Sequence, residues 1–443
     1  MKHLLTLRRI SALLLCLLLC ISACFAEGAP ADGASEEAPE AESQEPFALT
    51  NANMAILYEP QTDTILYELA PDKHNPPASM TKVMTAVLVL ENVEDLTEMV
   101  TVPAEALSPE YCYWMDTDHL LEGEQHTVMD LLKYLLIPSG NESATTLAYY
   151  VTGGDIPGFI QMMNDKAAEL GMTETHYEDP HGLSDDSYIS VRDMLTLSQY
   201  AMQFPVFRNI VKLKGGTLPA SGPRVTPMTF STTNRVMNPG SNKAYQTDFA
   251  SDVLGIKTGS TPAAGYNLAS CMKKDDLEFY SVVMRCSGTL DGREFVYGHY
   301  TETINLLTYA RQFSKKGYAA GETVQECSLF GILGSRIPVQ AQSDLYILER
   351  DEKELAPELV LEVSGSAVRQ GDVIGRVILS DEFGNVRETP LVAGADCQRS
   401  LLLPILAVVI VAAIAVVTVL VQKKKRTPAP IAQPGEDNET EKE

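Results

Sequence analysis

The sequence predicts an α/β (α+β) catalytic domain, in which helices flank an antiparallel sheet, followed by a small all-β domain and a C-terminal transmembrane helix. Three observations lead to this prediction. Residues 47–315 alternate long apolar stretches of helical character with short strand-like runs, whereas residues 320–396 are strand-like throughout. Residues 401–421 carry no charged side chain and are long enough, at about 1.5 Å per residue, to cross a hydrocarbon core of roughly 30 Å.

The N-terminal segment predicts export. Residues 1–26 begin with basic residues, continue with an apolar stretch and end in small residues, which is typical of a signal peptide. A second interpretation stays open, because the residues up to Cys24 also resemble a lipidation signal. Residues 27–46 are rich in alanine, glutamate and proline, which predicts a disordered acidic linker.

The first string with chemical content is Ser79-Met-Thr-Lys82. Two prolines precede it and a mostly apolar run follows, which predicts a buried helix beginning at Ser79. The i, i+3 spacing brings the hydroxyl and the amine within reach of each other, and the free N–H groups of a helix start could stabilise an oxyanion. The same spacing recurs from Ser270 to Lys273, but there it resembles a strand entering a charged turn, so we assign it no catalytic role.

Two further strings follow in the chain. Ser139-Gly-Asn141 lies between the helix-like segments 127–137 and 142–151, where a loop can direct polar groups into a cleft; alone, it would be an ordinary helix cap. Lys257-Thr-Gly259 closes a strand-like run, and two more such runs follow it. These three runs predict an antiparallel meander, and the catalytic part is expected to end in a helix across residues 294–313.

In this order the three strings are the established signature of serine β-lactamases and penicillin-binding proteins. The chain resembles the D-alanyl-D-alanine carboxypeptidases, the low-molecular-weight penicillin-binding proteins of serine peptidase family S11. The resemblance extends over most of residues 47–313 and includes segments 54–58, 77–86, 137–144, 179–183 and 255–259, and Arg293. It implies a fold like that of the serine β-lactamase and penicillin-binding-protein transpeptidase domain.

The resemblance also implies a role for each residue of the site. Ser79 would be the nucleophile, Lys82 its base when neutral, and Ser139 a proton relay to the departing D-alanine. Substrate binding would fall to Asn141, Lys257, Thr258, Gly259, Ser260 and Thr261, with the backbone N–H groups of Ser79 and Ser260 as the oxyanion hole. The implied substrate is a peptidoglycan stem peptide ending in D-Ala-D-Ala, β-lactams would acylate Ser79, and no cofactor or metal is implied.

Two other functions are considered. A β-lactamase of the same superfamily is disfavoured, because the string is Ser-Gly-Asn and no Glu-x-x-Leu-Asn follows. A non-catalytic wall-binding protein is disfavoured by the intact Ser79, Lys82, Ser139 and Lys257.

The sequence gives no indication of a metal site or of nucleic-acid binding. The seven histidines lack zinc-site spacing, and the net charge of −25 argues against nucleic-acid binding.

The C-terminal part predicts attachment to the membrane. A basic cluster follows residues 401–421 directly, which by the positive-inside rule places residues 422–443 in the cytoplasm and the catalytic domain on the cell-wall side.

No catalytic constellation occurs in residues 320–396. Outside the signal segment five cysteines remain, and a bridge between Cys271 and Cys286 is left open.

Overall fold

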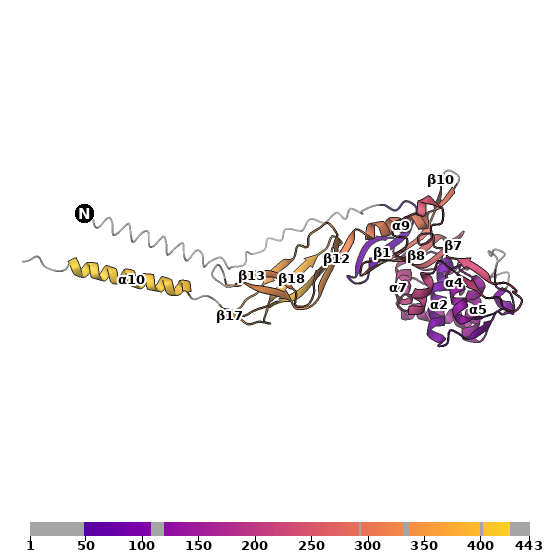
Figure 1. The fold of residues 1–443 in the computed structure, drawn as a ribbon, viewed down its shortest axis with the longest axis horizontal. Coiled ribbons are helices and arrows are strands. Elements are labelled where there is room, and N and C mark those ends of the chain that lie inside the picture. Colours follow the sequence, from indigo (N-terminus) through magenta and orange to yellow (C-terminus); the bar gives the residue numbers. More distant parts are fainter. Residues whose placement is uncertain (1–47, 108–118, 292–293, 331–335, 399–401, 426–443) are drawn as a thin grey trace, which may run out of the picture. The chain divides into compact units, whose positions relative to one another are not determined.

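The computed structural model describes residues 48–107, 119–291, 294–330, 336–398 and 402–425 (Figure 1). The predicted signal peptide, the acidic linker, Cys112, Arg293 and most of the predicted cytoplasmic tail lie outside these residues.

A five-stranded antiparallel sheet organises the first part of the chain. Its order is β2-β1-β9-β8-β7, formed by β1 (Met54–Glu59), β2 (Thr64–Leu69), β7 (Val253–Thr261), β8 (Gly265–Lys274) and β9 (Leu277–Cys286). The predicted meander is confirmed as β7-β8-β9. The hairpin β1–β2 joins it because Met54 pairs with Met284 of β9. This arrangement leaves β7 at an edge of the sheet.

Helices cover the sheet. They are α2 (Lys82–Asn92), α4 (Val128–Leu136), α5 (Asn141–Thr152), α6 (Ile156–Glu169), α7 (Val191–Ala201), α8 (Pro205–Val211) and α9 (Gly298–Ala310). Figure 1 shows α9 on one side of the sheet and the group of α2, α4, α5 and α7 on the other. Two short hairpins complete this part, β3 (Met99–Thr101) with β4 (Gln125–Thr127) and β5 (Gly215–Leu218) with β6 (Met228–Ser231).

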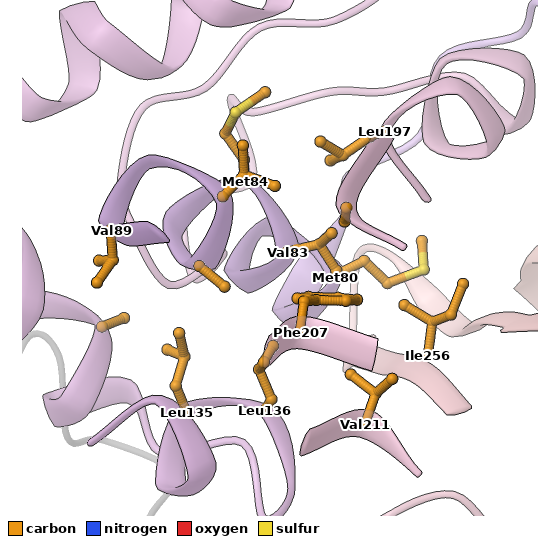
Figure 2. Packing of buried hydrophobic residues seen from close by; sticks show 14 of the residues in the cluster. Met80, Val83, Met84, Val89, Leu135, Leu136, Leu197, Phe207, Val211 and Ile256 are labelled. Carbon is orange, nitrogen blue, oxygen red and sulfur yellow. The ribbon is translucent and has the colours of Figure 1, made fainter. Parts of the chain in front are cut away.

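Helix α2 is the central helix of this part. Every residue from Lys82 to Val89 is buried, so the helix is enclosed on all sides. Figure 2 shows its side chains among those of the surrounding elements, with Met80 and Val83 close to Phe207 and Ile256. Because the residues around the first turn of α2 are packed in this way, the backbone at Ser79 is held firmly.

Two predicted helix starts are wrong. Ser79 lies in a 3-10 turn, η1 (Ala78–Thr81), and the α-helix begins only at Lys82. Ala78 has a φ of +50°, which is incompatible with α-helix, and Met80 N donates to Pro77 O instead. The helix expected from Glu294 begins at Gly298, because β11 (Glu294–Tyr297) pairs with β10 (Gly288–Asp291).

The second part of the chain is all-β, as predicted. A sheet of order β13-β14-β19-β18-β16 is accompanied by the pairs β12–β15 and β17–β20. The strands are β12 (Phe313–Tyr318), β13 (Thr323–Ser328), β14 (Arg336–Ala341), β15 (Leu345–Arg350), β16 (Glu358–Leu361), β17 (Ala367–Val368), β18 (Val373–Ser380), β19 (Val386–Ala393) and β20 (Cys397–Gln398). Their apolar residues form a hydrophobic cluster of their own, between Ile337 and Cys397. The exact domain boundaries expected from the sequence, 47–315 and 320–396, stay predictions.

Two more expectations can be compared with the structure. Helix α10 (Leu402–Lys425) contains one stretch, Ile405–Gln422, that is long and apolar enough to cross a membrane, and none of it is buried. Cys271 and Cys286 are free thiols, because the register of β8 and β9 places Cys271 opposite Tyr280 and Cys286 opposite Tyr266.

Candidate active site

The amine of Lys82 is the centre of a buried hydrogen-bond network. Its Nζ lies 2.8 Å from Ser79 Oγ, 2.7 Å from Asn141 Oδ1 and 2.7 Å from the carbonyl oxygen of His181. The structure thus brings together two of the predicted catalytic residues and one predicted substrate-binding residue. The fourth member, a backbone carbonyl, was not predicted.

Burial controls the charge of this lysine. The side chain of Lys82 is fully buried, and the loss of solvation lowers the pKa of its amine to about 7, against the opposing influence of the Asp179 and Glu142 carboxylates. Asn141 Oδ1 and His181 O can only accept hydrogen bonds, so they use two N–H groups of Lys82. In the neutral amine the remaining position is a lone pair, and it faces the hydroxyl of Ser79.

The carbonyl of His181 is positioned by a tight loop. The carboxylate of Asp179 accepts hydrogen bonds from His181 N (2.8 Å), Ser184 N (2.6 Å) and Gly182 N. Burial alone would raise the pKa of Asp179, but the bonds and charge of His181 and the two other backbone N–H groups hold it well below its usual range. His181 therefore contributes to the network through its backbone carbonyl.

Ser139 lies in the loop between α4 and α5, as predicted. Its φ is +78°, a strained value for a residue with a side chain, and its Oγ is buried without a hydrogen-bond partner within the described part of the chain. The alternative of a helix cap is wrong, because α5 has Gly140 at its N-cap and no side-chain cap bond. A strained backbone and an unsatisfied hydroxyl together mark Ser139 as a candidate functional group.

The third string lies on the edge strand β7. Lys257 is buried, its Nζ donates to Thr258 O at 3.2 Å, and burial, with the nearby charge of Lys82, lowers its pKa well below the ordinary value. Thr258 Oγ1 lies 2.6 Å from Thr233 Oγ1, so one hydroxyl donates to the other. At Gly259 a Cβ would approach Pro77 O to 2.6 Å, which explains why only glycine fits beside η1.

An open cleft of about 650 Å³ lies beside these groups, although Lys82, Asn141 and Lys257 are not among the residues that line it. Ser79, Ser139, Thr258, Gly259 and Ser260 line it, whereas the Thr261 hydroxyl accepts a hydrogen bond from Ala264 N in the β7–β8 turn. The wall of the cleft also includes aromatic residues that were not predicted to belong to the site, namely Tyr245, Tyr266, Phe295, Tyr297 and Tyr300. Phe295 and Tyr297 lie two residues apart, a spacing that is typical of a strand and could have indicated β11. We did not predict this strand, because a helix was expected over these residues. No group of three His, Cys, Asp or Glu residues suited to a metal occurs among the described residues.

Comparison with known proteins gives one consistent result. The family model for D-alanyl-D-alanine carboxypeptidase, peptidase S11, matches residues 39–288. The carboxypeptidase DacF of Bacillus subtilis is 24% identical over 356 residues, covering 79% of this chain and 86% of the relative. A carboxypeptidase of Streptomyces sp. strain K15 is 32% identical over 217 residues, covering 47% and 71%. A D-alanyl-D-alanine endopeptidase of Escherichia coli is 28% identical over 287 residues, covering 61% and 86%.

Solved structures agree on the fold. The carboxypeptidase DacD of Francisella tularensis superposes with a TM-score of 0.58 at 20% identity, covering 80% of this chain and 96% of that one. The Streptomyces K15 DD-transpeptidase superposes with a TM-score of 0.52 at 25% identity, covering 60% and 98%.

Proposed function

The chain belongs to the D-alanyl-D-alanine carboxypeptidase family, serine peptidase family S11, and we propose that its cleft performs this reaction through an acyl-enzyme on Ser79. The family assignment makes it a serine peptidase that releases C-terminal D-alanine. The observation that carries the proposal is the contact of Ser79 Oγ with a buried lysine whose other two hydrogen bonds go to fixed acceptors.

In the acylation step Lys82 starts neutral and accepts the proton of Ser79 as Oγ attacks the carbonyl carbon between the two D-alanines. The bond between that carbon and the nitrogen of the last residue then breaks. The proton that Lys82 took up then passes through the Ser139 hydroxyl to the departing amine, so that Lys82 is neutral again, Ser139 keeps its hydroxyl, D-alanine leaves as the free amine and the remaining peptide is an ester of Ser79. Water later cleaves this ester and restores the hydroxyl.

Substrate binding would use the free edge of β7. Within the described residues this strand pairs only with β8, so an extended peptide can align along its outer edge. The N–H groups of Ser79 and Ser260 would stabilise the oxyanion, and loss of one such donor typically costs about 100- to 1,000-fold in rate. Because Asn141 Oδ1 is occupied by Lys82, its amide nitrogen would donate to a substrate carbonyl.

The C-terminal carboxylate would lie near Lys257 and Thr258, with Gly259 allowing close approach and Thr261 shaping the turn beyond. β-Lactams would acylate Ser79 by the same route. The intact network around Lys82 favours this enzyme over a non-catalytic wall-binding protein, and no observation favours a β-lactamase.

We also propose that α10 anchors the protein with its cleft on the cell-wall side. The 18-residue stretch Ile405–Gln422 of this helix is apolar apart from Thr418 and Gln422, and none of it is buried, which is unfavourable in water and favourable in a bilayer. The substrate would then be the stem peptide of peptidoglycan outside the membrane.

Release of D-alanine tests the proposal. The full chain, purified in detergent, is offered an acyl-Lys-D-Ala-D-Ala peptide, and release by the Ser79→Ala variant is expected to fall at least about 1,000-fold. Ser270→Ala is the matched control, because it removes the serine of the other S-x-x-K string, whose hydroxyl only donates to Gly255 O. No release by the folded wild-type protein, or equal loss in both variants, would contradict the assignment.

A further inference from the structure

Glu142 is a fully buried carboxyl group that takes no part in the steps described for Ser79 and Lys82. It directly follows Asn141 at the start of α5. Another buried carboxylate nearby, Glu124, is neutralised by Arg224 at 2.8 Å, whereas Glu142 forms no ion pair with a lysine or arginine of the described residues. Because a buried carboxyl group without a paired cation costs free energy, its presence beside the catalytic loop needs a reason.

Two hydrogen bonds from other segments hold this carboxyl group. Its Oε1 accepts from Leu120 N at 3.0 Å, in the segment before β4, and the side chain of Tyr134 in α4 also bonds to it. Both bonds favour the ionised form, so they oppose the rise that burial causes in the pKa of Glu142. The carboxyl group therefore joins α4, α5 and the segment before β4 at one buried point.

The same point supports the loop between α4 and α5. Gly140 N donates to Tyr134 O at 3.0 Å, and a side chain at residue 140 would collide with the ring of Tyr134. The next residue, Asn141, directs its Oδ1 to Lys82 Nζ at 2.7 Å. The partner of the buried carboxyl group thus lies directly behind the loop that carries the Ser139 hydroxyl and one acceptor of the catalytic amine.

The charge of Glu142 also acts on that amine. Its carboxylate and that of Asp179 both raise the pKa of Lys82, against the loss of solvation that lowers it to about 7. Without them the pKa would fall further, and the amine would be neutral more often but would be a weaker base. Asp179 is bound by the backbone of its own loop, so Glu142 is the charge that comes from the side of Ser139.

The other titratable and charged groups around this carboxyl group come from several elements. They are Lys82 of α2, Tyr134 of α4, His119 and Glu124 of the segment before β4, and Arg224 between β5 and β6. The last two neutralise each other. His119 is therefore the group whose titration has to be separated from that of Lys82.

We propose that Glu142 is a positioning residue of the acylation step, which supports the Ser139 loop through Tyr134 and keeps Lys82 a sufficiently strong base. The inference rests on the proposed function, in which Lys82 accepts the proton of Ser79. Glu142 touches neither the substrate nor the reacting atoms, and it acts through Lys82.

Glu142→Gln removes the charge and keeps an oxygen for Leu120 N. The rate constant of acylation by a labelled penicillin is measured from pH 5 to 9 with the full chain in detergent. The midpoint of the profile should lie about one pH unit lower than in the wild type, and the upper plateau should be roughly threefold lower, because the base is weaker. The variant is therefore expected to be faster at pH 5 and slower at pH 9. A purely structural role would lower the rate at every pH.

Tyr134→Phe tests the same inference independently. It removes one hydrogen bond to the carboxyl group and so favours the uncharged form of Glu142. The midpoint should shift in the same direction as in Glu142→Gln but by less. In the Glu142→Gln background the change at Tyr134 should cause no further shift, since the carboxylate through which it acts is gone.

Two control variants should keep the wild-type midpoint. Glu302→Gln changes another buried carboxyl group, which accepts from Thr50 N and Asn51 N and does not act on Lys82. His119→Gln removes the neighbouring histidine. An unchanged midpoint in both Glu142→Gln and Tyr134→Phe, a rate lowered equally at every pH, or the same shift in His119→Gln would overturn this inference alone. Absence of acylation in the wild-type protein would instead contradict the proposed function.

Discussion

Lys82 illustrates how a single side chain can be prepared for catalysis by burial. Two acceptors, Asn141 Oδ1 and His181 O, hold the amine in one orientation whether or not it is charged. Removal of its proton therefore needs no rearrangement, and the lone pair forms where the Ser79 hydroxyl already lies. Since burial lowers the pKa of this amine to about 7, a substantial fraction is neutral under physiological conditions.

This predicts the pH dependence of acylation. Only the neutral amine can accept the Ser79 proton, so the second-order rate constant should rise about tenfold per pH unit below pH 7 and level off above it. The measurement is acylation by a labelled penicillin whose own charge is constant over this range. Lys82→Arg, which cannot deprotonate, should show less than roughly 1% of the wild-type rate at every pH. A flat wild-type profile from pH 5 to 8 would refute the role of Lys82 as base.

The 3-10 turn η1 depends on two glycines that approach it from different elements. Gly259 of β7 lies against Pro77, and Gly182 lies against Ala78, where a Cβ would come within 1.8 Å of the carbonyl oxygen. Asn267 on β8 adds a tether, since its Nδ2 donates to Pro76 O at 3.2 Å. The strained φ of Ala78 is therefore imposed by its surroundings and places Ser79 opposite Lys82.

Gly182→Ala should consequently damage both stability and catalysis. Its φ of +87° and the clash with Ala78 together predict a loss of about 2–4 kcal/mol in the free energy of unfolding, and displacement of the adjacent His181 carbonyl should slow acylation. Gly171→Ala is the matched control, because its φ is +73° but nothing lies within 4 Å of its Cβ; it should cost only about 1 kcal/mol. Unfolding by urea and acylation rates measure both effects, and equal losses in the two variants would contradict the contact with η1.

Comparison with the sequence shows which elements were predictable. Ser79 with Lys82, the Ser139 loop and the β7-β8-β9 meander depend on residues close together in the chain, so spacing and apolar pattern were sufficient. The carbonyl of His181 is 99 residues away from Lys82, and no local pattern indicates such a contact.

The chain combines an acidic composition with an apolar helix, α10, near its C-terminus. A net charge of −25 disfavours adsorption to an anionic membrane surface, so electrostatics alone would not keep the enzyme there. The unburied apolar stretch Ile405–Gln422 supplies the only described segment able to cross a bilayer. Attachment and catalysis are thereby assigned to different parts of the chain.

Removal of all residues after 398 should therefore separate the two properties. The shortened protein is expected in the soluble fraction, while the full chain sediments with membranes. Its kcat/KM on a short acyl-Lys-D-Ala-D-Ala peptide should stay within about twofold of the full chain in detergent, because every residue lining the cleft lies between Ser79 and Tyr300. Membrane fractionation and D-alanine release measure the two outcomes independently. If the shortened chain still sedimented with membranes, another segment would have to be the anchor. If the shortened chain became soluble and kept its unfolding transition but lost activity, α10 would have to contribute to the cleft.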